Sequence, residues 1–255
     1  MKHHHRTTTD STSRLARALA DEHPGETLLV SADAQTEGRG RTARPWHSPS
    51  GGAWFSLVWP PTQPADRYQA LPLVVGLAVL ETLESAVRDA APDAAPRLTL
   101  KWPNDVLLDG RKVAGVLCEQ MLPWEATASL IIGVGVNVNF GAGDLPSDLR
   151  YPATTLADAA GARFDVPALI RAAADRIAAA VAQLEADGFT DDLRYRIEAR
   201  LAQLDAETSL ELHDQTVTGT IRGIGSAGEL KLDTEGQVRL LRSGEVIAAR
   251  PAEPA

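Results

Sequence analysis

The stretch LTLKWPNDVLLDGRKVAGVLCEQM, residues 98–121, carries the strongest fold signal in the chain. Residues 98–102 are mostly apolar and predict a strand, with Lys101 near its end. Asp109-Gly110 then separates two further apolar runs, and this dipeptide is typical of a tight hairpin turn. The single cysteine, Cys118, lies in the last run, which indicates a buried structural thiol and not a nucleophile.

Helix and strand patterns surround this hairpin and then give way to short strands. We expect helices over 10–22, 68–90, 167–187 and 190–202, the last capped by Thr190, and strands over 27–32, 52–59 and 128–140. After residue 206, short alternating segments separated by turn residues predict a small barrel. The predicted fold class is α+β: a disordered leader at 1–9, a domain with a mixed sheet and flanking helices at 10–205, and an all-β domain at 206–255.

Composition narrows the class of protein. The 255 residues are 44% hydrophobic and 23% charged, which excludes a disordered chain and a collagen-like repeat. The net charge of −9 makes generic binding to DNA or to an anionic membrane unfavourable. The longest apolar stretch, 71–80, is too short to span a bilayer, and the N-terminus is not a secretory signal. One cysteine fits a reducing cytoplasm, and we interpret His3 to His5 as part of the leader, without a metal site.

Two segments, 38–43 and 223–228, match the glycine pattern of dinucleotide-binding loops. That fingerprint needs a strand before it and a helix after it. Arg44-Pro45 follows the first match and an alternating strand pattern follows the second, so neither has this context. The chain also lacks a P-loop motif, and we therefore reject both nucleotide-binding folds.

Three polar segments are candidates for a binding site. Arg39, Arg41 and Arg44 alternate between glycines in a long loop, which favours binding of a carboxylate or phosphate over a merely solvated loop. Segment 101–105, KWPND, places Lys101 at a strand end beside a carboxylate, and residue types alone leave a site and a polar turn equally open. The same holds for 132–139, where alternating glycines suit either a close ligand or a strand packed under a helix.

Taken together and in order, the motifs closely resemble the biotin protein ligase family. They are DSTS at 10–13, QTEGRGRTARPWHSPSGGAWFSLVW at 35–59, KWPNDVLLDGRKVAGVLCE at 101–119 and IIGVGVNVN at 131–139. Residues 217–236 resemble the small SH3-like C-terminal domain of that family. The resemblance implies a class II synthetase-like catalytic domain followed by an SH3-like barrel.

The resemblance implies a two-step reaction. The biotin carboxylate attacks the α-phosphate of ATP to form biotinyl-5′-AMP, and a lysine of a biotin carboxyl carrier domain then attacks this intermediate. Bringing a carboxylate to a polyphosphate requires several cations, which the loop arginines, Lys101 and Mg²⁺ would supply. No protein nucleophile is needed, which agrees with the lack of a recognisable nucleophile–base set in the sequence.

The resemblance also assigns roles to individual residues. The catalytic set is Lys101, Arg39, Asp105 and Lys112, with Asp105 orienting the incoming lysine amine. Biotin contacts are expected from Ser11, Thr12, Ser13, Gln35, Gly38, Arg39, Gly40, Arg41, Lys101, Gly115, Gly133 and Gly135. ATP contacts are expected from Arg41, Arg44, Trp46, Asn104, Lys112 and Asn137.

Three positions depart from the family pattern. Ser13 replaces a common asparagine and shortens or loses its contact. Glu37 replaces an uncharged residue, and we expect it to pair with a loop arginine and weaken ligand retention. Ala43 replaces a common glycine and is expected to stiffen the loop. None of these changes removes a cation, so activity should survive.

About ten residues precede DSTS, which leaves no room for the DNA-binding domain of bifunctional family members. We therefore expect a monofunctional cytoplasmic ligase that acts on a carboxyl carrier domain, without DNA or membrane partners, as a monomer or homodimer. The alternatives are a lipoate or octanoate ligase, a regulatory binder of biotin that has lost transfer, and an SH3-like interaction module with an inert partner domain.

Overall fold

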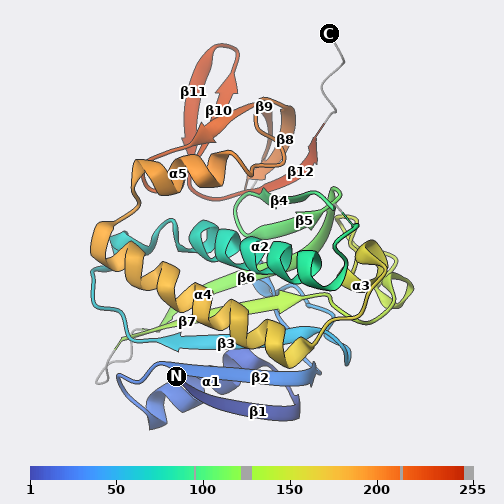
Figure 1. Ribbon diagram of the computed structural model, residues 1–255. Coiled ribbons are helices and arrows are strands. Elements are labelled where there is room, and N and C mark those ends of the chain that lie inside the picture. Colours follow the sequence, from blue (N-terminus) through green and yellow to red (C-terminus); the bar gives the residue numbers. More distant parts are fainter. Residues whose placement is uncertain (95, 122–127, 213–214, 250–255) are drawn as a thin grey trace.

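The computed structural model describes residues 1–94, 96–121, 128–212 and 215–249. Two sheets dominate it, a seven-stranded sheet in the order β1-β2-β3-β7-β6-β5-β4 and a five-stranded sheet in the order β11-β10-β9-β8-β12 (Figure 1). The strands are β1 Lys2–Thr9, β2 Leu28–Gln35, β3 Ala53–Trp59, β4 Leu98–Lys101, β5 Asp105–Leu108, β6 Arg111–Met121, β7 Ser129–Val136, β8 Glu207–Leu212, β9 Gln215–Ile224, β10 Leu230–Thr234, β11 Gln237–Leu241 and β12 Glu245–Ala249. The helices are α1 Thr12–Glu22, α2 Leu71–Ala90, α3 Leu156–Ala160, α4 Val166–Asp187 and α5 Asp191–Glu198, with short 3-10 turns at Arg41–Ala43, Ala65–Tyr68 and Ala142–Asp144.

The seven-stranded sheet separates two apolar cores. Leu29 of β2 packs on the α2–α4 side, whereas Leu28 and Val30 pack against α1 on the other side. This alternation follows from the pleat, which turns successive side chains to opposite faces. Figure 1 shows α2 and α4 lying across one face. The α1 helix packs mainly on β2, β3 and β7, and it meets β6 at Glu119, which lies 2.5 Å from Arg17.

The central hairpin forms where the sequence predicts it. β5 and β6 are joined at Asp109-Gly110, with φ values of 48° and 74°. Both residues therefore adopt the left-handed conformation that a two-residue hairpin turn of this kind requires. The strand β4 was expected over 98–102 but ends at Lys101. The Trp102–Pro103 peptide bond that follows it is cis. Cys118 packs against the core but is half-buried, and burial raises the pKa of its thiol.

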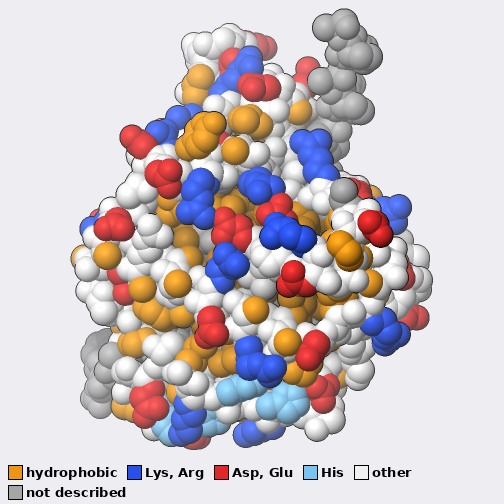
Figure 2. Space-filling model, viewed as in Figure 1, with side chains coloured by type: hydrophobic (Ala, Val, Ile, Leu, Met, Phe, Trp, Pro, Cys, Tyr) orange, Lys and Arg blue, Asp and Glu red, His pale blue; other side chains and the backbone are white. Residues whose placement is uncertain are grey.

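The N-terminal residues contradict the prediction of a disordered leader. Residues 2–9 form β1, which pairs in parallel with β2 from Lys2↔Leu28 to Thr9↔Gln35. His3 and His5 both hydrogen-bond to Ser31 on β2, at 2.8 and 3.0 Å. An edge strand can expose both of its faces, so its residues can be polar throughout. Residues 2–9 therefore show no alternation of apolar and polar residues that would predict a strand. Histidines gather at this edge in Figure 2.

The α2 segment illustrates how an apolar helix can serve a core. By length and composition alone, residues 65–90 form a helical segment that could cross a membrane. However, 72% of its apolar stretch of 18 residues is buried inside the protein. Leu80 and Leu83, for example, are at most 1% exposed and belong to the main core. We interpret α2 as the central core helix of the main domain.

The small domain shares this core. Leu210, Ile221 and Leu232 of the five-stranded sheet belong to the same apolar cluster as α2. The indole of Trp102 also donates a hydrogen bond to the Gly228 carbonyl, at 3.1 Å. We propose residue 206 as the division between the two domains, because the second sheet begins at Glu207.

Hydrogen exchange tests the strand assignment of β1. Backbone amides of residues 2–9 that pair with β2 should exchange more slowly than those of a free synthetic peptide KHHHRTTT, because paired amides exchange only when the strand opens. The measurement is exchange monitored by mass spectrometry at neutral pH. Equal exchange in the protein and in the peptide would contradict β1.

Candidate functional site

A cavity of about 800 Å³ lies on the α1 side of the large sheet. Every residue predicted for the site lines it, together with segments that the sequence analysis did not include. The predicted residues are Ser11, Thr12, Ser13, Gln35, Gly38, Arg39, Gly40, Arg41, Arg44, Trp46, Lys101, Asn104, Asp105, Lys112, Gly115, Gly133, Gly135 and Asn137. Four parts of the chain, 11–13, 35–46, 101–115 and 133–137, therefore form one site.

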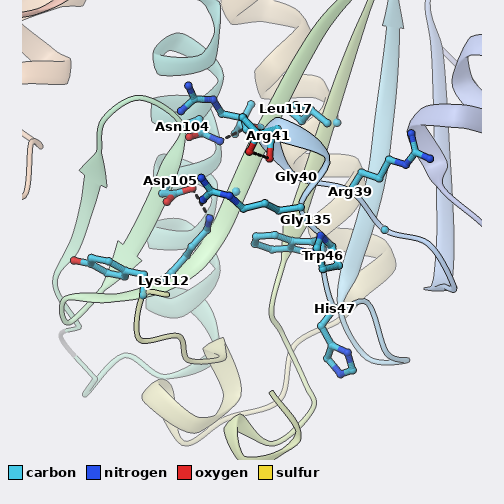
Figure 3. A pocket seen from close by; sticks show the side chains of 18 of the residues that line it. Arg39, Gly40, Arg41, Trp46, His47, Asn104, Asp105, Lys112, Leu117 and Gly135 are labelled. Atoms are coloured by element: carbon cyan, nitrogen blue, oxygen red, sulfur yellow. Dashed lines mark hydrogen bonds and ion pairs between the residues drawn. The ribbon is translucent and has the colours of Figure 1, made fainter. Parts of the chain in front are cut away.

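Glycines on β6 and β7 form the floor of the cavity. Gly115 and Gly135 are register partners, and the Trp46 indole lies on them (Figure 3). A Cβ atom on Gly135 would lie 2.5 Å from Trp46 Nε1, and one on Gly133 would lie 2.7 Å from Ser13 Oγ. Among the described residues, the buried Trp46 Nε1 has no hydrogen-bond partner. The alternating glycines thus make room for the Trp46 and Ser13 side chains, and close contact with a ligand at 132–139 stays a prediction.

One end of the cavity is built from hydroxyl and amide groups. Thr12 Oγ1 lies 2.9 Å and Ser13 Oγ 3.1 Å from Ser56 Oγ. The Gln35 side chain accepts from Thr12 N at 2.7 Å and donates to Ser48 Oγ at 2.9 Å. Ser13 thus contacts Ser56, and the shortened or lost contact to biotin stays a prediction. Ser56 was missed, although a serine within the apolar strand AWFSLVW was a usable signal.

Cationic and acidic groups meet at the other end. Asp105 Oδ1 lies 2.6 Å from Lys112 Nζ, and Asp105 Oδ2 lies 3.4 Å from Lys101 Nζ (Figure 3 shows the Lys112 contact). Lys101 is 2% exposed, and burial lowers the pKa of its ammonium while the Asp105 charge opposes that shift. KWPND is thus a buried charge cluster and not a surface turn.

The glycine–arginine loop has a defined conformation. Gly40 N donates to Arg44 O and Trp46 N donates to Gly38 O, each at 2.8 Å. Arg41 is half-buried and donates to the Gly244 carbonyl at 3.2 Å, and burial lowers the pKa of its guanidinium. Ala43 has a φ of 57°, a left-handed conformation that explains why glycine suits this position.

The arginines of the loop do not all point inward. Arg39 is exposed, and Figure 3 shows its guanidinium directed away from Asp105 and Lys112. Arg44 contacts Glu245 of the small domain at 2.5 Å. The loop therefore contributes Arg41 to the cavity interior, while Arg39 and Arg44 lie at its rim in this structure.

Glu37 does not pair with a loop arginine, contrary to the sequence prediction. Its carboxylate lies 3.0 Å from Arg14 of α1, which also pairs with Asp10. The pairing fixes the start of the loop to α1, while Arg41 and Arg44 of the loop bond to Gly244 and Glu245. Sequence spacing could not show this, because α1 approaches the loop only in the folded chain.

Two further parts of the lining carry no recognisable motif. Segment 145–151 covers one side of the cavity, and Tyr151 lies over Lys101 with Nζ 4.8 Å from the ring centroid. The small domain contributes Glu211 and Glu245, both of which pair with Arg150. Segment 145–151 shows no periodic pattern, and Glu211 and Glu245 lie far along the chain from the other motifs. Periodicity and local motifs therefore could not identify them.

The two asparagines of the predicted site brace its backbone. Asn104 Nδ2 donates to Val116 O at 2.7 Å, and Asn137 Nδ2 donates to Thr154 O at 3.0 Å. Both side chains line the cavity, so contact with ATP remains a prediction for them.

The buried lysine predicts a pH-dependent stability. Because folding lowers the pKa of Lys101 below its ordinary value, the unfolded chain binds more protons between the two values, and the free energy of unfolding should rise with pH in that window. Lys101→Met abolishes this titration. Urea unfolding of both proteins between pH 7 and 10 gives their free energies of unfolding. The free energy of the wild type should rise relative to that of Lys101→Met as the pH rises. A constant difference would contradict the buried charge.

The Trp46 platform predicts a steric effect. Gly135→Ala should displace the indole, because the new methyl group would overlap it. Gly143→Ala is the matched control, since a Cβ there has nothing within 4 Å. Acrylamide quenching, compared with Trp46→Phe in the same background, should show a more accessible Trp46 in the first variant only. Unchanged quenching would show that the indole does not rest on Gly135.

Comparison with known proteins agrees with this site. The model of the Biotin/lipoate A/B protein ligase family matches residues 6–137. The chain is 32% identical to the "Biotin--[acetyl-CoA-carboxylase] ligase" of Paracoccus denitrificans, covering 93% of this chain and 97% of that protein. It is also 32% identical to the "Bifunctional ligase/repressor BirA" of Bacillus subtilis, covering 92% of this chain and 70% of the relative.

Solved structures lead to the same family. The biotin protein ligase of Aquifex aeolicus in complex with biotin and ATP superposes with a TM-score of 0.81 at 31% identity, covering 98% of this chain and 99% of the other. The similarity therefore extends over both sheets. The resemblance seen in the motifs is confirmed, and the chain belongs to the biotin/lipoate A/B protein ligase family.

Proposed function

We propose that this protein attaches biotin to a carrier protein in two ATP-dependent steps. In the first, a carboxylate oxygen of biotin bonds to the α-phosphorus of ATP, and pyrophosphate leaves. In the second, the amine of a carrier lysine bonds to the acyl carbon of biotinyl-5′-AMP, and AMP and a proton leave. The observation that carries the proposal is the cavity itself, in which a glycine floor and a hydroxyl-lined end adjoin a buried cluster of lysines.

The geometry suggests how the first step is served. Two anions must meet, and their repulsion at about 4 Å is of the order of several kcal/mol in a partly dry site. Lys101 is buried and fixed near this point, so its ammonium would stabilise charge without reorganising solvent. Lys112 and Arg41 would add positive charge from β6 and from the loop.

The two ends of the cavity match the two ends of the intermediate. The hydroxyl and amide groups of Thr12, Ser13 and Gln35 suit a polar ring system that both donates and accepts hydrogen bonds. We place biotin there, beside the Trp46 indole that covers Gly115 and Gly135. Trp46 and the arginines at the rim suit the adenine ring and the phosphates of ATP.

Asp105 is the candidate for orienting the carrier lysine in the second step. Its carboxylate is buried and held by two lysines, so it can accept a hydrogen bond from an incoming amine in a fixed direction. Of the five carboxylates that line the cavity, Glu37, Asp105, Glu211 and Glu245 each contact a lysine or arginine, and Asp148 is the fifth. Among the described residues, no three His, Cys, Asp or Glu side chains form a group that could hold a metal ion. We assign no residue to a metal and derive no step through one.

The carrier is inferred from the chemistry of relatives. The Paracoccus protein is named for acetyl-CoA carboxylase as its target, so we propose a biotin carboxyl carrier domain as the partner here. The reaction consumes ATP, and we place it in the cytoplasm. A monomer and a homodimer are both compatible with the sequence.

Pyrophosphate exchange into ATP tests the reaction and its substrate. Exchange should require biotin and should not occur with lipoate or octanoate. Lys101→Met should reduce the rate by about 100-fold or more, because the buried cation near the reacting groups is lost. Lys231→Met on β10 is the control outside the cavity and should leave the rate unchanged.

Two results would contradict the proposal. Exchange supported by lipoate or octanoate alone would move the substrate to another member of the family. Biotin binding without any exchange would indicate a regulatory binder.

A further inference from the structure

Tyr151 lies in the cavity wall, outside every motif that identifies the family. Its ring covers the Lys101 ammonium, with Nζ 4.8 Å from the centroid. The electron-rich face of an aromatic ring attracts a cation, and the attraction grows when water is excluded. Lys101 is 2% exposed, so the contact lies in such an environment.

The backbone that follows Tyr151 is anchored to Lys112 of β6 by two hydrogen bonds. Lys112 N donates to Pro152 O at 2.7 Å, and Thr154 N donates to Lys112 O at 3.0 Å. The Asn137 side chain in turn donates to Thr154 O. Tyr151 is therefore fixed to the start of β6, next to the second lysine of the cluster, and its ring has a defined place over the first.

The Tyr151 ring gives the Lys101 ammonium a contact that Asp105, shared between two lysines, does not give. Asp105 lies closer to Lys112, at 2.6 Å, than to Lys101, at 3.4 Å, so one carboxylate is shared between two ammonium groups. Asp105 of β5, Lys112 of β6 and Glu245 of β12 are the charged groups that act on Lys101. The Tyr151 ring contacts the ammonium without adding a net charge, and it leaves the remaining N–H groups of Lys101 free to donate.

We propose that Tyr151 is a positioning residue for adenylation, whose ring face holds the Lys101 ammonium in place for the biotin carboxylate and the α-phosphate. The proposal rests on the proposed function, because Lys101 has this task only in a ligase. The ring, and not the phenol oxygen, is the group that acts. A phenylalanine at position 151 should therefore preserve the function of the tyrosine, and an aliphatic side chain should not.

Two variants separate the ring from the hydroxyl. Tyr151→Leu keeps an apolar side chain but removes the ring, and Tyr151→Phe keeps the ring. We expect Tyr151→Leu to lower kcat of biotin-dependent pyrophosphate exchange about tenfold, with KM for biotin little changed. Tyr151→Phe should stay within about twofold of the wild type. Tyr195→Leu, at a side chain that is 71% exposed, is the control for the same substitution and should have no effect.

The pH dependence of the exchange rate separates loss of the ring contact from a general structural defect, which would lower the rate without shifting the profile. Without the ring the ammonium is less stabilised, so the alkaline limb of the Tyr151→Leu profile should shift to lower pH, while that of Tyr151→Phe should not. NMR titration of 13C-labelled Lys101 in the free protein should show the same order of midpoints, whether or not the protein is active.

The outcomes distinguish the two proposals. Equal losses in Tyr151→Leu and Tyr151→Phe, or a wild-type rate and titration in Tyr151→Leu, would overturn the role of the ring. If the wild type shows no exchange with biotin, lipoate or octanoate, the proposed function fails. The Lys101 titration then still decides whether the ring holds the ammonium.

Discussion

A charged lysine removed from water is the constraint on which the rest of the site depends. Burial disfavours the charged form of Lys101, so the surrounding chain must supply contacts that keep the charge and fix its position. Asp105 provides the opposite charge, and Tyr151 covers the ammonium with a ring. The turn between β4 and β5 brings the lysine and the carboxylate together as register partners, which makes the β4–β5 pair the framework of the chemistry.

The sheet provides the space in which this cluster can act. Because α1 packs mainly on β2, β3 and β7 and meets β6 at Glu119, the cavity forms on the same face over Gly115 of β6. Glycines on β6 and β7 lower the floor there, and the loop with Trp46 covers it. The small domain closes one side through Gly244 and Glu245. A water-poor cavity thus arises from incomplete coverage of a sheet and not from a separate binding module.

Turn chemistry and periodicity predicted the hairpin at Asp109-Gly110, the helices α1, α2, α4 and α5, and the barrel-like C-terminal strands, but not the short α3. The site residues were assigned from the family resemblance, and every one of them lines the cavity.

The misses share one cause, which is distance along the chain. Residues 2–9 read as polar and unstructured because their partner strand lies elsewhere. Glu37 finds Arg14 across the fold, and Tyr151 lies in a segment without periodicity. Contacts that form only after folding leave no local pattern, so propensity and motif spacing cannot predict them.

The ion pair between Arg44 and Glu245 has a consequence for the exchange of parts among related proteins. The loop and the small domain are separated by some two hundred positions in the chain, yet Arg41 and Arg44 both bond to the strand start at 244–245. A chimera that takes its C-terminal barrel from a relative would replace half of this contact and keep the other half. Grafted barrels should therefore work best when the residues of the loop, 38–46, are transferred with them.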